Sequence, residues 1–525
     1  MKSIGFRRLA GLALAAMIAG APLASMAQPA AAPAAPAAAP AAASATPEAA
    51  APAAAAPEAA SPAPAAAEPA TFPTEITDTV DKGDVAWMMV STLLVLFMIV
   101  PGLALFYGGL VRQKNMLSVL MQVSTVTVIG MIAWAFWGYS LAFSDGGGLD
   151  AFVGGTSRFF LNNVTTSTNV ATFSVGVAIP ELVFVCFQMT FACITAALVL
   201  GSIAERVKFG AVVAFSVLWP LVVYYPVAHM VWWWAGPDAV ALHPADPIQA
   251  GFIWSKGAID FAGGTVVHIN AGLAALIACL LLGPRKGFKT EAMPPHSLTM
   301  SLIGAGILWV GWFGFNAGSN LESNAYAGLA MANTFLATAA AGFSWTVVEW
   351  LTRKKASMLG MISGMVAGLV AITPAAGFAG PIGAIILGLV VSPICVFACT
   401  YVKNLFKYDD SLDAFGIHCV GGIVGAIGTG LVVNPAWGGA GIVDYVHCAA
   451  GGGDADITTC PTAAYDLVTQ LVAQLWGVGT TVVWCGIGSL IVFLAIKYTI
   501  GLRATPEQEE EGLDISVHGE RAYHD

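Results

Sequence analysis

The stretch DFAGGTVVHINAGLAALIACLLLG, residues 260–283, places an aspartate and a histidine at the start of an otherwise apolar run. A run of about 20 apolar residues is long enough to cross a bilayer as a helix. Ionisable side chains inside such a run are costly, and they usually mark a functional site. We therefore predict a membrane helix that carries function at Asp260 and His268.

The rest of the chain has the composition of a polytopic helical membrane protein. Charged residues make up 10% of the 525 residues and hydrophobic residues 57%. No basic patch is interleaved with aromatic residues, so nucleic acid is not an expected partner. Eleven apolar runs are long enough to span a bilayer: 86–109, 117–143, 180–203, 210–235, 259–283, 298–318, 325–351, 357–374, 379–402, 411–434 and 466–499.

The two ends of the chain differ from this membrane domain, which we place at 77–500. Residues 1–27 have a basic start, a short apolar core and small residues at the end, as in a cleavable signal peptide. Residues 28–76 are mostly Ala and Pro and predict a disordered spacer. Lys and Arg concentrate in alternate connections, which predicts a periplasmic mature N-terminus and a cytoplasmic tail, 501–525.

A pair of Asp–His spacings indicates an internal duplication. Asp260 precedes His268 by eight residues, and Asp410 precedes His418 by eight. If spans 1–5 and 6–10 are repeats, their odd number makes the halves inverted, as in many transporters. Each histidine then lies about 12 Å along its helix from its aspartate, and the two meet near mid-bilayer. The alternative is that each is a buried polar residue bonded to a neighbouring helix.

Aromatic residues gather at the outer ends of several predicted spans. Phe187 and Phe191 lie one turn apart, and Trp232 ends the fourth span. Trp312, Phe315 and Ser319 share one helix face. Rings and a hydroxyl suit capture of a small cation, although interfacial aromatic belts are also common in membrane proteins. Asp260 is expected to cap its helix and shape this mouth.

Several longer motifs resemble the ammonium transporter family (Amt/Mep/Rh), over about residues 78–525. They are PGLALFYGGLVRQKN, FQMTFACIT, AERVKF, DFAGGTVVHINAG, GWFGFNAGS, GLVAITPAAG and the tail EGLDISVHGERAYH. The resemblance implies an all-α homotrimer in which each subunit has its own pore. Each subunit would have eleven transmembrane helices, arranged as two inverted five-helix repeats plus a final long helix.

The resemblance also implies roles for single residues. An outer site would recruit ammonium at Phe191, Trp232 and Ser319, and Phe191 and Phe315 would gate the pore. The paired pore histidines would be His268 and His418, with Asp260 at the mouth. Ammonium would lose its proton near the gate, and ammonia would cross the apolar lumen. Cys419 departs from the pattern, because glycine is expected after the second histidine.

The predicted protein is an ammonium transporter of the bacterial inner membrane, without enzymatic activity, cofactor or metal. Its expected partners are the lipid bilayer, ammonium or ammonia, and a cytoplasmic PII signal protein that binds near the tail. The alternative is an ammonium sensor that signals through the same tail. A histidine metal enzyme would lack a third ligand. Cys448 and Cys460 share a polar loop and would form a disulfide if that loop is periplasmic.

Overall fold

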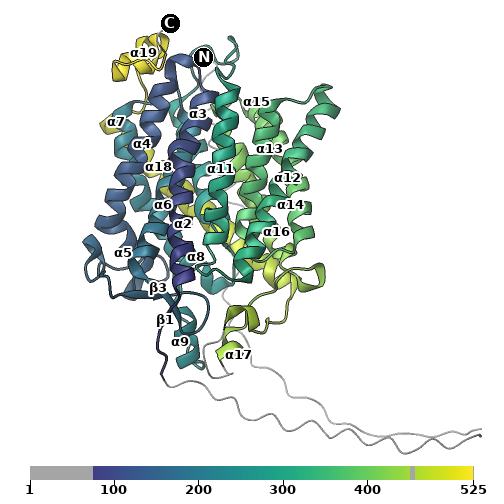
Figure 1. The fold of residues 1–525 in the computed structure, drawn as a ribbon. Coiled ribbons are helices and arrows are strands. Elements are labelled where there is room, and N and C mark those ends of the chain that lie inside the picture. The colour runs from purple at the N-terminus through teal and green to yellow at the C-terminus, as the bar shows by residue number, and fades with distance from the viewer. Residues whose placement is uncertain (1–74, 450–455, 524–525) are drawn as a thin grey trace, which may run out of the picture. The chain divides into compact units, whose positions relative to one another are not determined.

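The computed structural model describes residues 75–449 and 456–523. The predicted signal peptide, nearly all of the predicted spacer and the last two residues of the tail lie outside the described residues. The described chain is a bundle of helices (Figure 1). One end carries α19 (Pro506–Glu511) and is called the tail end; the other carries three short strands, α9 (Gly236–Leu242) and α17 (Tyr445–Ala449), and is called the sheet end.

Ten helical segments in the described ranges are long and apolar enough to span a membrane. They run over Lys82–Leu110, Gln113–Phe143, Glu181–Ile203, Phe209–Trp232, Gly264–Leu282, Leu298–Gly318, Met358–Ala375, Pro381–Phe406, Phe415–Val432 and Leu467–Thr499. These agree with ten of the eleven predicted runs, and the all-α polytopic class is confirmed. The α-helices within them are α2 (Lys82–Phe97), α3 (Ala104–Leu110), α4 (Met116–Ala133), α5 (Tyr139–Phe143), α6 (Glu181–Ile203), α7 (Phe209–Trp219), α8 (Tyr225–Trp232), α10 (Asn270–Leu282), α11 (Leu298–Gly318), α13 (Met358–Ile372), α14 (Pro381–Phe397), α15 (Lys403–Phe406), α16 (Val420–Val432) and α18 (Leu467–Thr499).

The remaining predicted run forms α12 (Ala325–Arg353). Its 29 residues would reach about 43 Å, enough to cross a bilayer. Its hydropathy is lower because buried polar residues line its inner face, among them Asn333, which donates to the carbonyls of Ala376 and Ala379 at 2.8 and 2.6 Å. The count of eleven spans stays a prediction.

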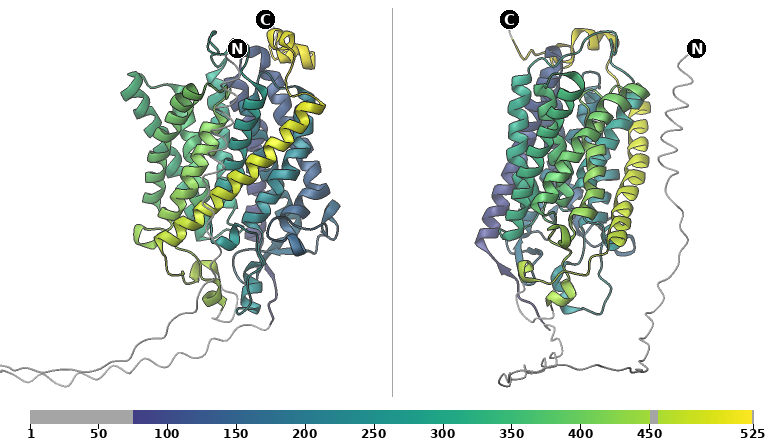
Figure 2. Two further views of the ribbon diagram at one scale, coloured as in Figure 1. Left: turned by 180° about the vertical axis from the view of Figure 1, so that it is seen from behind. Right: turned by 90° about the vertical axis from the view of Figure 1, so that its right-hand side faces the viewer.

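Glycines let α13 and α14 approach α12 closely. A Cβ built on Gly368 or Gly388 would lie 2.6 or 2.4 Å from the carbonyl oxygen of Ala337. Helices in membranes associate through such small residues because lipid provides little hydrophobic drive for packing. The last of the candidate membrane spans, α18, crosses the outside of the bundle at an incline (Figure 2). Inclination accommodates an apolar helix longer than the bilayer is thick.

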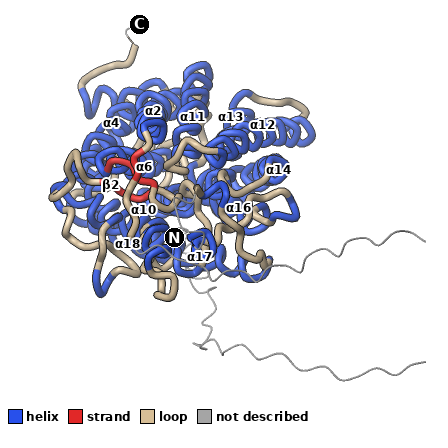
Figure 3. Tube along the Cα trace, turned by 60° about the horizontal axis from the view of Figure 1, so that its bottom comes forward, coloured by secondary structure: helices blue, strands red, loops and turns tan. Residues whose placement is uncertain are grey.

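The sheet end joins segments that are distant in sequence. Strand β1 (Thr79–Val80) pairs in parallel with β3 (Val177–Pro180), and β2 (Asn169–Ala171) pairs antiparallel with β3 on its other side. Figure 3 shows these strands beside α6, which β3 enters directly. Cys448 and Cys460 form a disulfide at this end of the bundle.

Candidate functional site

The two histidines lie in contact. Nδ1 of His268 is 3.3 Å from Nδ1 of His418, so one ring can donate to the other. The rings are nearly parallel, with centroids 5.4 Å apart, and both are buried, at 1% and 4% exposure. The chain thus brings two imidazoles from segments far apart in sequence into one hydrogen-bonded pair.

An aspartate caps the segment that carries each histidine. The Asp260 carboxylate accepts the backbone N–H groups of residues 263–266 at 2.5 to 3.1 Å and the hydroxyl of Thr265. Asp410 accepts the N–H groups of Ala414 and Phe415 at 3.1 and 2.8 Å. Both histidines lie in a π-helical turn just after the cap, Gly264–Ile269 or Phe415–Cys419. The Asp–His spacing is therefore matched by a repeated local structure.

The two helices run in opposite directions. Asp260 lies near the sheet end, where its carbonyl accepts the indole N–H of Trp232 at the end of α8. Asp410 accepts the hydroxyl of Ser202 at 2.5 Å, near the end of α6. Because α6 starts at the sheet end, Ser202 and Asp410 lie towards the tail end. Opposite starting points allow the two histidines to meet between them.

A narrow cavity reaches both imidazoles. Its remaining lining is ten apolar or aromatic side chains: Met98, Leu103, Phe106, Ile194, Leu198, Val267, Leu308, Trp312, Phe315 and Val366. A bare cation would lose its hydration here and gain few polar partners, at a high cost in free energy. The lining suits a small neutral molecule.

Aromatic rings lie between this cavity and the sheet end. Phe191 and Phe315 stack with centroids 4.2 Å apart and an interplanar angle of 23°. Phe191 also contacts Phe187 at 4.9 Å and meets Trp232 edge to face at 5.9 Å. Phe315 lies 6.1 Å from the ring of His268. The predicted aromatic residues thus form one continuous contact chain that ends at the histidines.

Ser319 lies one turn beyond Phe315, immediately after α11. Its hydroxyl donates to the Phe315 carbonyl at 2.8 Å, which leaves the oxygen lone pairs free to accept from a ligand. Ser319 and Trp232 are both partly buried, in contrast to the fully buried Phe191. From the sheet end to the cavity, the side chains therefore change from half-buried polar and aromatic groups to fully buried apolar ones.

Trp312 contributes a contact that the sequence did not predict. Its ring stacks on His268 with centroids 5.4 Å apart, and its indole N–H donates to the Thr373 hydroxyl at 2.9 Å. Thr373 in turn donates to the carbonyl of Leu369. The sequence signal for this contact is the motif GLVAITPAAG, in which Thr373 is the only hydroxyl residue.

Cys419 packs where glycine was expected. A Cβ on Gly272 would come within 2.2 Å of the Cys419 backbone nitrogen, so α10 and the turn before α16 touch almost backbone to backbone. The glycine that permits this contact is on the facing helix. The departure from the family pattern at Cys419 is therefore accommodated beside the histidine pair.

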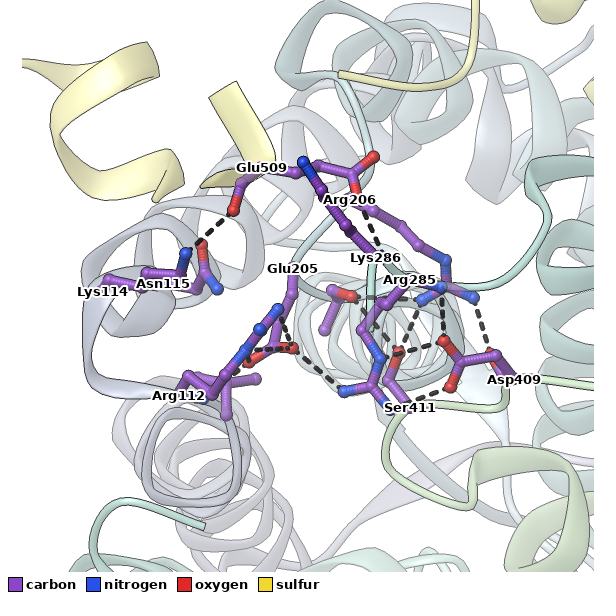
Figure 4. Close-up of polar contacts among 12 residues, drawn as sticks. Arg112, Lys114, Asn115, Glu205, Arg206, Arg285, Lys286, Asp409, Ser411 and Glu509 are labelled. Carbon is purple, nitrogen blue, oxygen red and sulfur yellow. Dashed lines mark hydrogen bonds and ion pairs between the residues drawn. The ribbon is translucent and has the colours of Figure 1, made fainter. Parts of the chain in front are cut away.

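A cluster of charged residues, separate from the histidine site, lies at the tail end (Figure 4). Glu205 pairs with Arg112 and Arg285, each at 3.0 Å, and Arg285 also pairs with Asp409 at 2.8 Å. Arg206 is fully buried and donates to the carbonyls of Gly283, Ala204 and Asp409 and to the Ser411 hydroxyl. The positive-charge pattern places Arg206 in a connection but does not reveal that it is buried.

These pairs set the ionisation of the two carboxylates. Burial alone would raise the pKa of Glu205, but Arg285 and Arg112 outweigh it and hold that pKa below its ordinary value. Burial is likewise outweighed at Asp409, whose pKa is lowered by its bonds to Arg285 and by the charge of Arg206. Both carboxylates are thus charged partners, and their ion pairs join four connections between helices, those that contain Arg112, Glu205, Arg285 and Asp409.

The tail packs against the same end of the bundle. Asp514 accepts the backbone N–H groups of Leu117 and Ser118, and so caps the start of α4. Lys114 donates to the carbonyl of Glu509 at 3.0 Å, and Glu509 pairs with Arg503. The tail is therefore held by several bonds that a solvated acidic tail would not make.

Comparisons with known proteins agree with this arrangement. Residues 86–523 match the model of the Ammonium Transporter Family. The chain is 42% identical to an ammonium transporter of Aquifex aeolicus, covering 84% of this chain and 94% of the relative, and 41% identical to one of Bacillus subtilis, covering 84% and 99%.

Solved structures with the same fold include a chain described as a sensor Amt protein, with a TM-score of 0.71 at 26% identity, covering 83% of this chain and 98% of that one. Mep2 of Saccharomyces cerevisiae matches with a TM-score of 0.68 at 31% identity, covering 82% and 88%. The curated relatives are transporters rather than enzymes. This multi-pass membrane protein belongs to the ammonium transporter family.

Proposed function

We propose that this member of the family moves ammonium by separating it into a proton and ammonia. Ammonium would be captured at the sheet end, lose its proton at the phenyl pair, and cross the apolar cavity as ammonia. The proton would pass along His268 and His418. The observation that carries this proposal is the 3.3 Å contact between the two imidazoles inside an apolar lining.

The capture site would be formed by Phe191, Trp232 and Ser319. A cation over an aromatic ring is attracted by the ring quadrupole, more strongly where water is partly excluded. The Ser319 oxygen would accept one hydrogen bond from the ion. The stacked pair of Phe191 and Phe315 would then gate the cavity, because a molecule can pass only when the rings separate from their 4.2 Å stack.

The separation step follows from the cost of burying charge. A desolvated ammonium ion without a counter-charge is strongly disfavoured in an apolar interior, whereas ammonia is neutral. Imidazole can accept a proton on one nitrogen and release one from the other, so a contacting pair can relay protons. Potassium has no proton to lose, and the same step would exclude it.

The tail end would face the cytoplasm of a bacterial inner membrane. Most Lys and Arg residues of the connections lie at this end, among them Arg112, Arg206 and Arg285, as the positive-inside rule requires of a cytoplasmic face. Arg158 and Lys256 lie in connections at the sheet end. We further propose a homotrimer and regulation by a PII signal protein. The tail contacts at Lys114 and Asp514 support the regulation, because they hold the tail as an ordered surface at this end of the bundle.

A sensor is the second candidate, favoured by the similarity to the sensor Amt protein. A sensor would bind ammonium and change its tail contacts without sustained transport. The two functions differ in one measurement, namely current.

The test is current recording from purified protein in liposomes under ammonium pulses. A concentration-dependent ammonium current with no potassium current is expected. Binding without current would favour the sensor, and neither binding nor current would overturn both.

Removal of one imidazole tests the relay. His268→Ala should abolish the proton-coupled current or admit potassium, because the hydrogen-bonded pair is broken. His243→Ala, which removes a histidine at the sheet end that is 67% exposed, is the matched control and should behave like the wild type. A His268→Ala current with wild-type size and selectivity would mean that the imidazole is only structural.

A further inference from the structure

Two arms, residues 443–448 and 456–462, are joined at the sheet end by the Cys448–Cys460 disulfide, and they reach different sides of the proposed capture site. The first arm contains Tyr445, at the start of α17, whose ring lies 5.0 Å from that of Trp234. Trp234 also stacks on Trp254 at 5.1 Å and is bridged to Ala250 through the backbone. Trp234 is two residues beyond Trp232, so this arm holds the segment that leaves the capture site.

The second arm contains Ile457, which is buried at 7% exposure. Its backbone N–H donates to the Ser174 hydroxyl at 2.9 Å. Ser174 donates that hydroxyl, at 2.8 Å, and its own N–H, at 2.9 Å, to Glu322. Glu322 lies three residues beyond Ser319, in the turn that joins α11 to α12. This arm therefore holds the turn that follows Ser319, on the other side of the proposed capture site.

The disulfide joins these two arms. Cys448 follows Tyr445 by three residues and Cys460 follows Ile457 by three, so Ile457 lies inside the disulfide-closed loop and Tyr445 lies between the disulfide and the base of the loop. The base of the loop is paired separately, by Asp444 N–H to the Pro461 carbonyl at 2.9 Å and by the bridge between Val443 and Thr462. The cross-link thus adds a constraint between the arms beyond the one at the base.

We infer that the Cys448–Cys460 disulfide is a positioning clamp, which holds Trp232 and Ser319 in register for ammonium capture. The inference rests on the proposed function. Trp232 comes from α8 and Ser319 from the end of α11, in the two halves of the chain, so their relative position depends on what connects their borders. Loss of the clamp would lower the fraction of molecules with both groups in place, and apparent affinity falls in proportion to that fraction.

The clamp should affect capture and spare the pore. The histidine segments are fixed by their own caps at Asp260 and Asp410. The Phe191–Phe315 stack is formed by α6 and α11 themselves. Opening the disulfide is therefore expected to raise the half-saturating ammonium concentration and to leave the maximal current unchanged.

The experiment records ammonium currents over a concentration series from the full-length protein in liposomes. The samples are the wild type with and without the reductant TCEP, and the Cys448→Ser/Cys460→Ser variant with and without it. The other seven cysteines are free thiols, so the reductant has no other disulfide to open. Mass spectrometry of peptides reports the state of the bond. Tyr445→Ala breaks the first arm at its ring, and Tyr445→Phe is the matched control.

Reduced wild type, the double Ser variant and Tyr445→Ala should each raise the half-saturating concentration by about threefold or more at unchanged maximal current. The double Ser variant should not respond to TCEP. The reduced wild type keeps the test valid if a variant fails to fold. An unchanged half-saturating concentration, or a lower maximal current alone, would overturn the clamp while the transport function stands. A wild type without ammonium current would overturn the proposed function and the clamp with it.

Discussion

Gly422→Ala tests whether the histidine contact depends on the close approach of the two helices. A Cβ at this position would lie 2.8 Å from the Gly264 carbonyl oxygen and 3.1 Å from the His268 Cβ. Ordinary contacts begin at 3.4 Å, so the helices must separate by 3.4 − 2.8, or about 0.6 Å. The imidazole nitrogens, now 3.3 Å apart, would move to about 3.9 Å, beyond hydrogen-bond distance.

Overpacking of this kind costs about 1–3 kcal/mol. If about 1.4 kcal/mol of it raises the transport barrier, the ammonium current falls tenfold. Gly421→Ala is the matched control, because its Cβ meets only side-chain atoms, Val370 Cγ1 at 3.1 Å and Cys395 Sγ at 3.6 Å. Currents in liposomes and thermal unfolding in detergent would be measured for both. A Gly422→Ala protein with wild-type current would refute the dependence on helix contact.

Two further predictions concern supporting bonds. Thr373→Val removes the acceptor of the buried Trp312 indole N–H, so it should cost about 1–3 kcal/mol of stability and lower the ammonium current. Thr373→Ser keeps the hydroxyl and should keep the wild-type stability and current. Equal currents in the two variants would contradict a role of Thr373 in positioning His268. Glu205 and Asp409 have pKa values below their ordinary ones in the folded protein, so the stability they contribute is complete above the unfolded pKa of about 4 and is lost as the pH falls through the folded values. The thermal unfolding temperature in detergent should therefore fall once the pH is lowered below about 4. An unfolding temperature that does not change with pH in this range would be evidence against the tail-end cluster.

Hydropathy predicts most of the helices because each apolar run must be long enough for the bilayer. It is less informative for α12, where Asn333 and Glu349 lower the apolar content although both are buried. Those side chains find partners inside the bundle, such as the Ala376 carbonyl for Asn333. A hydropathy scale assigns the same cost to a polar residue whether or not it has a partner, so it underestimates this helix.

Contacts between distant segments account for what the sequence did not predict. Trp312 and Thr373 bond across 61 residues, and β1 pairs with β3 through Thr79 and Val177. No local sequence pattern predicts either contact, because each one depends on how the helices pack. Arg206 is similar: its charge is visible in the sequence, but its burial depends on carbonyls of three different segments.

The Asp–His spacing was predictive because both copies contain the same two elements, a capping aspartate and the helical turn that follows it. Helix begins at Gly264 and at Ala414, four residues after each aspartate and four residues before each histidine. The eight residues therefore advance about 6 Å along a helix and not the roughly 12 Å expected from the sequence, because only the second half of the spacing is helical. The contact between His268 and His418 depends instead on the opposite directions of the two helices and on their close packing, in which a Cβ on Gly422 would lie 3.1 Å from the His268 Cβ. The aspartates contribute by stabilising the two helix starts that bring the histidines to this contact.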